Sequence, residues 1–292
     1  MFKNVLVGVD FRPGGRDAIA LATQLLDRGG TLTLAYVFPG GAVPSYVITP
    51  GLLGEERERA EAQLEQERAD ADVEAEAVVV ESASPGRGLH ETAESRASDL
   101  LVLGSTHRGI FGRAMLGDDT RDAIDGAPCA VAVAPTGFAQ QAKPLATIGV
   151  GYDGSPESET ALATARALAA SHNARVRALR VVTLGGYRYA GMMMMGEINQ
   201  FVEEDDARMK ALEGVEGHAE YGLPVEDLTA FAKEVDLLIV GSRGYGPWGR
   251  LVHGSTSAQL ARHTGGPLLI VPRTKPGGVH DDAGADRTAI TA

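Results

Sequence analysis

The feature that most constrains the fold of this chain is an internal repeat. Residues 100–105 (LLVLGS) resemble residues 237–242 (LLIVGS), 137 positions later. Upstream, residues 7–10 (VGVD) resemble residues 150–153 (VGYD), 143 positions later. Insertions and deletions between these anchors account for the difference in offset. Two units of about 140 residues account for almost the whole chain, and each is the size of an ordinary domain. The sequence therefore predicts two copies of one domain.

The boundaries of the two copies follow from composition. The stretch between Pro135 and Pro144 lacks hydrophobic periodicity and is bounded by prolines, which is typical of a linker. After Pro272 the chain is rich in glycine, aspartate, threonine and alanine, and we predict that it is disordered. The predicted organisation is a first domain at 1–135, a linker at 136–144, a second domain at 145–273 and a tail at 274–292.

Each copy alternates short apolar runs with longer amphipathic segments. The predicted strands are 3–9, 31–37, 74–80, 99–104 and 130–134, then 146–152, 175–182, 215–220, 236–241 and 268–272. The predicted helices are 15–28, 54–71, 87–97 and 119–126, then 157–172, 197–213, 224–234 and 255–264. Near-continuously apolar strands are covered on both faces, and strand–helix alternation gives right-handed crossovers. We therefore predict an α/β protein with two tandem doubly wound, parallel, five-stranded, Rossmann-like sheets, whose ligands bind at the carboxyl ends of the strands.

Charge and composition exclude several classes of protein. The net charge is −12, with 27 basic and 39 acidic residues, which disfavours nucleic acid as a partner. No apolar stretch reaches the roughly 18 residues that a membrane span needs. The first apolar run is interrupted at Asp10, too early for a signal peptide, so we expect a cytoplasmic protein. The single cysteine, Cys129, can form no internal disulfide, and no histidine spacing indicates a metal site.

A glycine-rich loop follows the predicted strand 236–241. It contains five glycines and leads to Ser255 and Thr256, which open a predicted helix. Glycines allow a backbone to approach a ligand, and the free N–H groups and positive dipole end of a helix favour an anion. These features alone are equally consistent with a phosphate site and with a tight turn followed by an ordinary N-cap.

Two nucleotide-binding motifs do not describe this loop. A P-loop needs Gly-Lys-Ser/Thr, and the loop has no lysine. The segment 244–249 matches G-x-G-x-x-G formally, but Pro247 interrupts it and no helix opens at its third glycine. The sequence therefore indicates neither a P-loop enzyme nor a dinucleotide-binding domain.

The loop resembles the ATP-binding signature of the universal stress protein family, G-x2-G-x9-G-[ST]. Gly241, Gly244 and Gly254-Ser255 match that signature without a mismatch. The predicted strand ends at 151–158 and 179–182 are also similar to the family's nucleotide pocket, and the resemblance extends over about residues 2–272. It implies ATP, with Mg²⁺ accompanying the triphosphate, on these residues of the second copy: Asp153, Gly154, Ser155, Val181, Gly241, Gly244, Gly254, Ser255 and Thr256. Arg243, in the same loop, is equally consistent with a contact to a phosphate oxygen and with a solvated surface charge.

The first copy departs from this pattern. His107 stands where the second copy has Gly244, and Asp118 stands where it has Ser255. A carboxylate about 4 Å from a phosphate costs on the order of 4 kcal/mol at an effective dielectric constant near 20. The dipole of a helix contributes only about 1 kcal/mol. We therefore expect the first copy not to bind ATP.

The function expected from these observations is that of a stress-related regulator or sensor rather than a dedicated catalyst. Slow ATP hydrolysis on the same fold, or a nucleotide-free protein-interaction module, are the alternatives. The resemblance also implies that domains pair through their fifth strands, so we expect an intrachain pseudo-dimer and allow for a homodimer. Residues 192–195, four consecutive methionines, are expected to begin a helix, or alternatively to form part of a lid over the nucleotide.

Overall fold

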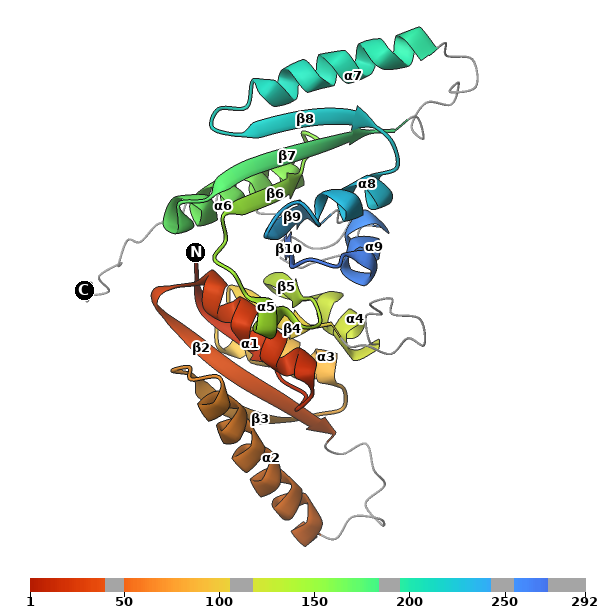
Figure 1. The fold of residues 1–292 in the computed structure, drawn as a ribbon. Helices are drawn as coiled ribbons and strands as arrows, with labels where there is room; N and C mark the ends of the chain where they lie inside the picture. Colours follow the sequence, from red (N-terminus) through yellow and green to blue (C-terminus); the bar gives the residue numbers. More distant parts are fainter. Residues whose placement is uncertain (40–49, 106–117, 184–194, 243–254, 273–292) are drawn as a thin grey trace, which may run out of the picture.

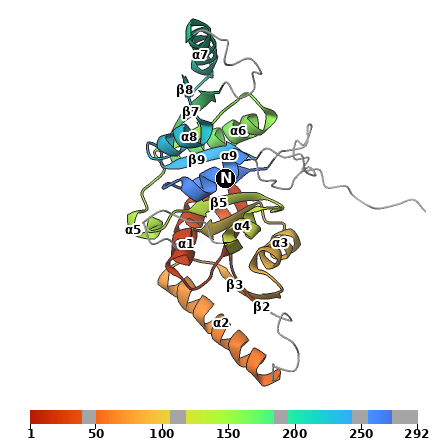
Figure 2. The same ribbon diagram turned by 90° about the vertical axis from the view of Figure 1, so that its right-hand side faces the viewer.

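The computed structural model describes residues 1–39, 50–105, 118–183, 195–242 and 255–272. They form one ten-stranded sheet, in the order β3-β2-β1-β4-β5-β10-β9-β6-β7-β8, with helices on both of its faces (Figures 1 and 2). The strands are β1 (Phe2–Gly8), β2 (Leu26–Pro39), β3 (Glu76–Ser82), β4 (Leu100–Gly104), β5 (Ala130–Ala134), β6 (Thr147–Gly151), β7 (Arg175–Val182), β8 (Glu216–Tyr221), β9 (Leu237–Gly241) and β10 (Leu268–Val271). The helices are α1 (Pro13–Leu25), α2 (Pro50–Asp70), α3 (Pro85–Ser95), α4 (Asp118–Ile124), α5 (Phe138–Gln141), α6 (Pro156–His172), α7 (Met195–Lys210), α8 (Pro224–Phe231) and α9 (Ser255–His263). Of the helices described, none is long and apolar enough to span a membrane.

Every strand and helix expected from the sequence is present, so the prediction of an α/β fold with doubly wound sheets is confirmed. Two local differences have physical causes. β2 begins at Leu26 instead of residue 31, because Leu26 pairs with Phe2 ahead of a register shift, and α1 therefore ends at Leu25. The linker, expected to lack regular structure, contains the short helix α5.

The two halves of the sheet meet at β5 and β10, near the middle of the molecule in Figure 1. All other neighbouring strands are parallel, whereas these two are antiparallel, with Ile270 opposite Val131 and Leu268 opposite Val133. Both strands are fully buried. The predicted pair of five-stranded sheets is thus one continuous sheet in this structure.

Two hydrophobic cores cover the faces of the sheet, and both extend across the joint between the repeats. One core combines residues of α1, α2, α6 and α7 with one face of the strands, and the other combines residues of α3, α4, α8 and α9 with the opposite face. At the joint, Ala132 and Leu269 belong to the first core, while Val131 and Ile270 belong to the second. Burial of apolar surface therefore connects the repeats on both faces.

A buried carboxylate fixes the linker to the first repeat. Asp17, in α1, has no exposed surface. Its two oxygens accept hydrogen bonds from the backbone N–H groups of Gly137 and Ala139, both at 2.8 Å. These N–H groups lie at the start of α5, where a helix has unpaired donors. Asp17 thus supplies, from another helix, the cap that Gly137 cannot provide.

Each repeat brings the end of one strand into close contact with the first turn of a helix. A Cβ atom on Gly104 would lie 2.1 Å from the carbonyl oxygen of Gly14, in α1. In the second repeat, a Cβ atom on Gly241 would lie 2.6 Å from the carbonyl carbon and oxygen of Glu157, in α6. Both positions therefore require glycine for packing alone, whether or not a ligand binds.

This contact predicts that Gly104→Ala destabilises the ligand-free protein. The added methyl group must displace the first turn of α1, at a cost of about 1–3 kcal/mol. Gly54→Ala is the matched control, since a Cβ atom on Gly54, an exposed residue of α2, would meet no atom of the described part of the chain within 4 Å. The control should be neutral or more stable by about 0.5–1 kcal/mol. Urea unfolding of the two variants checks this, and equal midpoints would contradict the packing argument.

The linker contact predicts that Asp17→Asn lowers the free energy of unfolding by about 1–3 kcal/mol, because the amide can accept only one of the two N–H groups. Asp70→Asn is the control, because Asp70 is exposed and pairs with Arg16 at 3.1 Å on the surface. An exposed pair contributes at most about 1 kcal/mol. Equal unfolding midpoints for the two variants would show that Asp17 does not anchor the linker.

Candidate functional site

The candidate site lies at the carboxyl ends of β6 and β9, which are neighbours in the sheet. From β6 the chain crosses to β7 on one side, and it later returns to β9 on the other side. The direction of the connections therefore reverses at β6, and a crevice for ligands forms at such a point. β6 ends at Gly151 and β9 at Gly241, so the two predicted motifs of the second repeat follow adjacent strands.

The turn after β6 is held by its own side chains. Asp153 Oδ1 accepts hydrogen bonds from the backbone N–H of Ser155, at 3.0 Å, and from its hydroxyl. Between them, Gly154 has a φ of +78°, which favours glycine. Ser155 is the N-cap of α6, and its side chain accepts from the N–H of Ser158. The three predicted residues Asp153, Gly154 and Ser155 thus form one compact turn at the edge of the crevice.

Val181 lies beyond the last residue of β7 that pairs with β6. The final pair of that register is Gly151 with Leu179. The carbonyl of Leu179 accepts from the N–H of Tyr152, and the carbonyl of Val182 accepts from the N–H of Gly222 on the opposite side. Successive residues of a strand point their backbone N–H and C=O groups to alternate sides. The backbone groups of Val181 therefore point to the same side as those of Leu179, at a level where β6 has already ended. This geometry suits recognition of a planar ligand edge by backbone groups.

Arg180 is a residue of this region that the sequence reasoning did not select. Its Nη1 donates to the carbonyl oxygen of Asp153 at 2.5 Å, and its Nε donates to Asp205, in α7. In the sequence, Arg180 lies within the predicted strand end 179–182, which also contains Val181. An arginine at the end of a strand is an unspecific signal, and its partner Asp205 lies 25 residues later, so sequence spacing alone could not have paired them.

Only part of the predicted phosphate loop belongs to the described residues. Ser242 is buried, and its N–H donates to the carbonyl of Val271 at 2.9 Å. Ser255 begins α9 and Thr256, the next residue, is half-buried. The predicted contacts of Arg243, Gly244 and Gly254 lie outside the described residues, as do the side chain of Ser255 and residues 192–194 of the methionine run. Gly241 has the packing role described above, which the sequence reasoning did not foresee.

The first repeat holds the equivalent turn in a different way. Phe11 stands in the place of Gly154 and has a φ of +58°. Its ring packs on that of Tyr36, the counterpart of Arg180, with 4.3 Å between the centroids. Arg12 replaces the capping serine and makes no side-chain cap. Its N–H still donates to Asp10 Oδ1, at 3.1 Å, as the N–H of Ser155 does to Asp153. An aromatic pair thus stands where the second repeat has a glycine and a cation.

Little of the corresponding loop of the first repeat, between β4 and α4, belongs to the described residues. His107 lies outside them, and Asp118 begins α4, although its side chain is not among the described ones. The inference that these two residues prevent ATP binding therefore remains a prediction from the sequence.

Tyr152, beside the turn, remains a neutral hydrogen-bond donor. Its hydroxyl donates to Glu159, in α6. Burial, followed by this hydrogen bond and the charge of Glu159, raises the pKa of Tyr152 to about 12. The neutral form therefore predominates throughout the physiological pH range, which makes the phenol unsuited to act as a general base.

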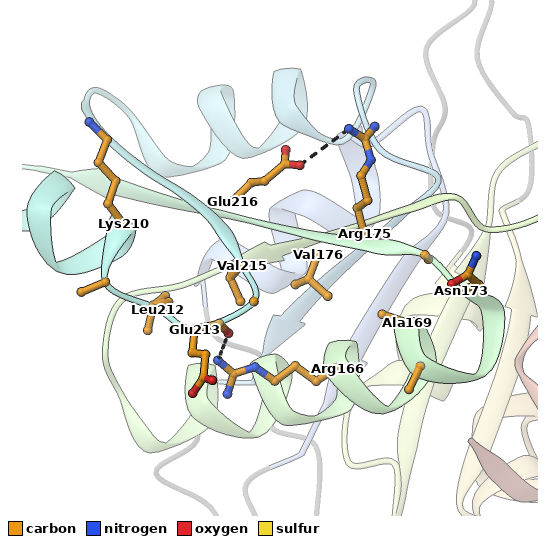
Figure 3. Close-up of a pocket in the computed structure, with 14 residues that line it drawn as sticks. Arg166, Ala169, Asn173, Arg175, Val176, Lys210, Leu212, Glu213, Val215 and Glu216 are labelled. Carbon is orange, nitrogen blue, oxygen red and sulfur yellow. Dashed lines mark hydrogen bonds and ion pairs between the residues drawn. The ribbon is translucent and has the colours of Figure 1, made fainter.

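Each repeat also has a cleft where its strands begin, at the other end of these strands from the turns described above. The one in Figure 3 has a volume of about 960 Å³ and lies between the ends of α6 and α7. There Arg166 donates to the carbonyl oxygen of Glu213 at 2.9 Å, and Arg175 lies 3.6 Å from Glu216. A cleft of about 1120 Å³ occupies the equivalent place in the first repeat. Since both repeats contain it, the cleft is a consequence of the fold.

Comparison with known proteins gives the family. The chain matches the Universal stress protein family twice, over residues 1–135 and 145–272. It is 28% identical over an alignment of 152 positions to universal stress protein MT2052 of Mycobacterium tuberculosis, and the match covers 43% of this chain and 47% of that protein. It is 25% identical over an alignment of 189 positions to universal stress protein Rv2005c of the same species, and the match covers 60% of this chain and 62% of that protein. The chain thus spans about half to three fifths of the length of these relatives.

The fold is also that of a solved structure. The crystal structure of a universal stress protein from Archaeoglobus fulgidus has a TM-score of 0.68 with this chain at 16% identity. The match covers 93% of this chain and 98% of that one, so the likeness includes both repeats. Two successive family matches and a shared fold lead to one conclusion: the chain belongs to the universal stress protein family and carries two copies of its domain.

Proposed function

We propose that this protein binds ATP in its second repeat and acts as a nucleotide-dependent, stress-related regulator or sensor rather than as a dedicated catalyst. The observation that supports this most is the intact G-x2-G-x9-G-[ST] pattern after β9. Gly241 ends β9 and Ser255 begins α9, so the pattern connects the crevice to a helix of nine residues. The unpaired N–H groups and the positive dipole end of such a helix favour a phosphate.

The other side of the crevice suits the nucleoside. Asp153 offers a carboxylate on a fixed turn, and Val181 offers backbone groups beyond the end of β6. A ribose hydroxyl can donate to the first, and the edge of a base can pair with the second. Mg²⁺ accompanies the triphosphate and neutralises part of its charge.

The proposed role is regulatory, and two side chains beside the turn after β6 agree with it because their polar atoms are already engaged. Tyr152 is neutral and already donates to Glu159. Asp153 Oδ1 is engaged by both the N–H and the hydroxyl of Ser155. Binding of a nucleotide is the proposed output, and slow ATP hydrolysis on the same fold is the alternative.

We also infer that the two repeats remain paired in solution as an intrachain pseudo-dimer. The support is the antiparallel contact between β5 and β10, whose residues are buried on both faces. Edge strands this apolar need a cover to avoid uncontrolled pairing. Association of two chains would need a separate surface.

Titration calorimetry with Mg²⁺-ATP should give one site per chain. The first repeat should not contribute, because Asp118 stands where Ser255 begins the helix of the second repeat. ATP at about 100 times its dissociation constant should also stabilise the fold by about 2.7 kcal/mol, with EDTA as a control for the metal. Two equivalent sites would contradict the proposed asymmetry, and no stabilisation at millimolar ATP would favour the nucleotide-free interaction module.

Ser255→Asp should weaken ATP binding by more than about 100-fold, since a carboxylate beside the phosphates costs several kcal/mol. Ser84→Asp is the matched control. Ser84 is the N-cap of α3 in the first repeat and accepts from the N–H of Arg87, a role that aspartate also performs well. The control should bind ATP as the unmodified protein does. Unchanged affinity in Ser255→Asp would show that the phosphates dock elsewhere.

A further inference from the structure

We infer that Arg180 is a positioning residue of the nucleotide site, which holds the Asp153 turn and the end of β7 at the spacing that a nucleoside needs. This inference rests on the proposed function. Arg180 lies between Leu179, the last residue of β7 paired with β6, and Val181, whose backbone faces the crevice. Its guanidinium reaches across to the turn after β6.

The guanidinium is itself held from outside the turn. Its Nε donates to Asp205, a carboxylate of α7 that is only 7% exposed. The other oxygen of Asp205 accepts from Arg208 at 3.0 Å. Hydrogen bonds between ionised groups are short and strong, and a planar guanidinium that makes two of its bonds in different directions has little freedom left. The position of Arg180 is thus fixed by a helix that does not belong to the turn.

Arg180 holds the main chain of the turn at Asp153, whereas the bonds within the turn hold the Asp153 side chain. The bonds from Ser155 hold the carboxylate of Asp153, whereas Arg180 Nη1 holds its carbonyl oxygen. Gly154 follows directly, and among the described residues beyond its chain neighbours a Cβ atom there would meet only Arg180 Nη1, at 4.0 Å. The peptide between Asp153 and Gly154, the flexible point of the turn, is therefore tied to β7.

The first repeat supports this assignment by contrast. The counterpart of Arg180 is Tyr36, which packs on the ring of Phe11 and so contacts a side chain of the turn. Both repeats thus connect the end of their second strand to the turn after their first strand. Only the second repeat, which retains the complete phosphate pattern, does so with a hydrogen bond to the backbone of the aspartate.

The test compares Arg180→Met with Arg177→Met. Arg177 lies on the same strand, is paired with Glu234 at 3.0 Å, and has a side chain that is 31% exposed against 27% for Arg180. After Arg180→Met, Asp205 still has Arg208 as a partner, so the fold should persist. Titration calorimetry measures the binding of Mg²⁺-ATP and of inorganic tripolyphosphate, which lacks the nucleoside, and thermal unfolding measures stability.

We expect Arg180→Met to weaken ATP binding about tenfold or more, as loss of a charged hydrogen bond at a binding site does. Its affinity for tripolyphosphate should equal that of the unmodified protein, and Arg177→Met should change neither. Asp205→Asn is a second variant. It leaves the hydrogen bond from Arg180 to Asp153 in place but removes the ion pair between Arg180 and residue 205. It should therefore weaken ATP binding less than Arg180→Met does.

Two outcomes would contradict the role of Arg180, and a third would contradict the proposed function instead. Equal ATP affinity in Arg180→Met and Arg177→Met would refute the role of Arg180. Parallel loss of ATP and tripolyphosphate in Arg180→Met would also refute it, because it would indicate a general defect of the domain. Absence of ATP binding in the unmodified protein would instead refute the proposed function.

Discussion

The architecture of this protein depends on one short antiparallel contact. Three pairs of residues between β5 and β10 join two parallel five-stranded sheets into a single ten-stranded sheet. Burial of apolar side chains stabilises this contact, because both strands contribute to the same two cores. Ala132 and Leu269 lie in the core on one face, and Val131 and Ile270 lie in the core on the other. Each repeat alone would expose an apolar edge strand, so the pairing protects both repeats at once.

The pairing also explains why the linker is ordered. After β5 the chain must reverse and cross one face before it can start β6. It does so beside α1, where the buried carboxylate of Asp17 accepts the N–H groups at the start of α5. The sequence showed a segment without periodicity between two prolines, and such a segment is typical of a linker. It could not show that an aspartate 120 residues earlier would cap it, because that partnership exists only in the folded chain.

Hydrophobic periodicity was sufficient to predict the strands and helices, since short, near-continuously apolar runs have few other solutions than a sheet covered on both faces. It also placed Asp153 and Gly241 at the ends of two strands, which the structure shows to be neighbours in the sheet. What it missed were contacts between distant segments. The sequence suggested that Gly241 lets the backbone approach a ligand. The structure shows that the close approach of α6 already requires a glycine at this position. Arg180 looked like an ordinary strand residue, and only the packing of α7 reveals its bonds to Asp153 and Asp205.

The two repeats preserve the contacts that build the fold and differ in those expected to serve a ligand. The close approach of a strand end to a helix occurs at both Gly104 and Gly241. The turn after the first strand, in contrast, holds an aromatic pair in one repeat and a glycine with an arginine in the other. Such a division is expected if one copy retained a binding role while the other was needed mainly as the structural partner of the joint.

Photo-crosslinking with azido-ATP, followed by peptide mapping, tests this division most directly, because it locates the nucleotide on the chain. The account predicts adducts confined to residues 145–272, competed away by unlabelled ATP. Competable adducts within residues 1–135 would contradict it, since they would place the nucleotide in the repeat that lacks the phosphate pattern.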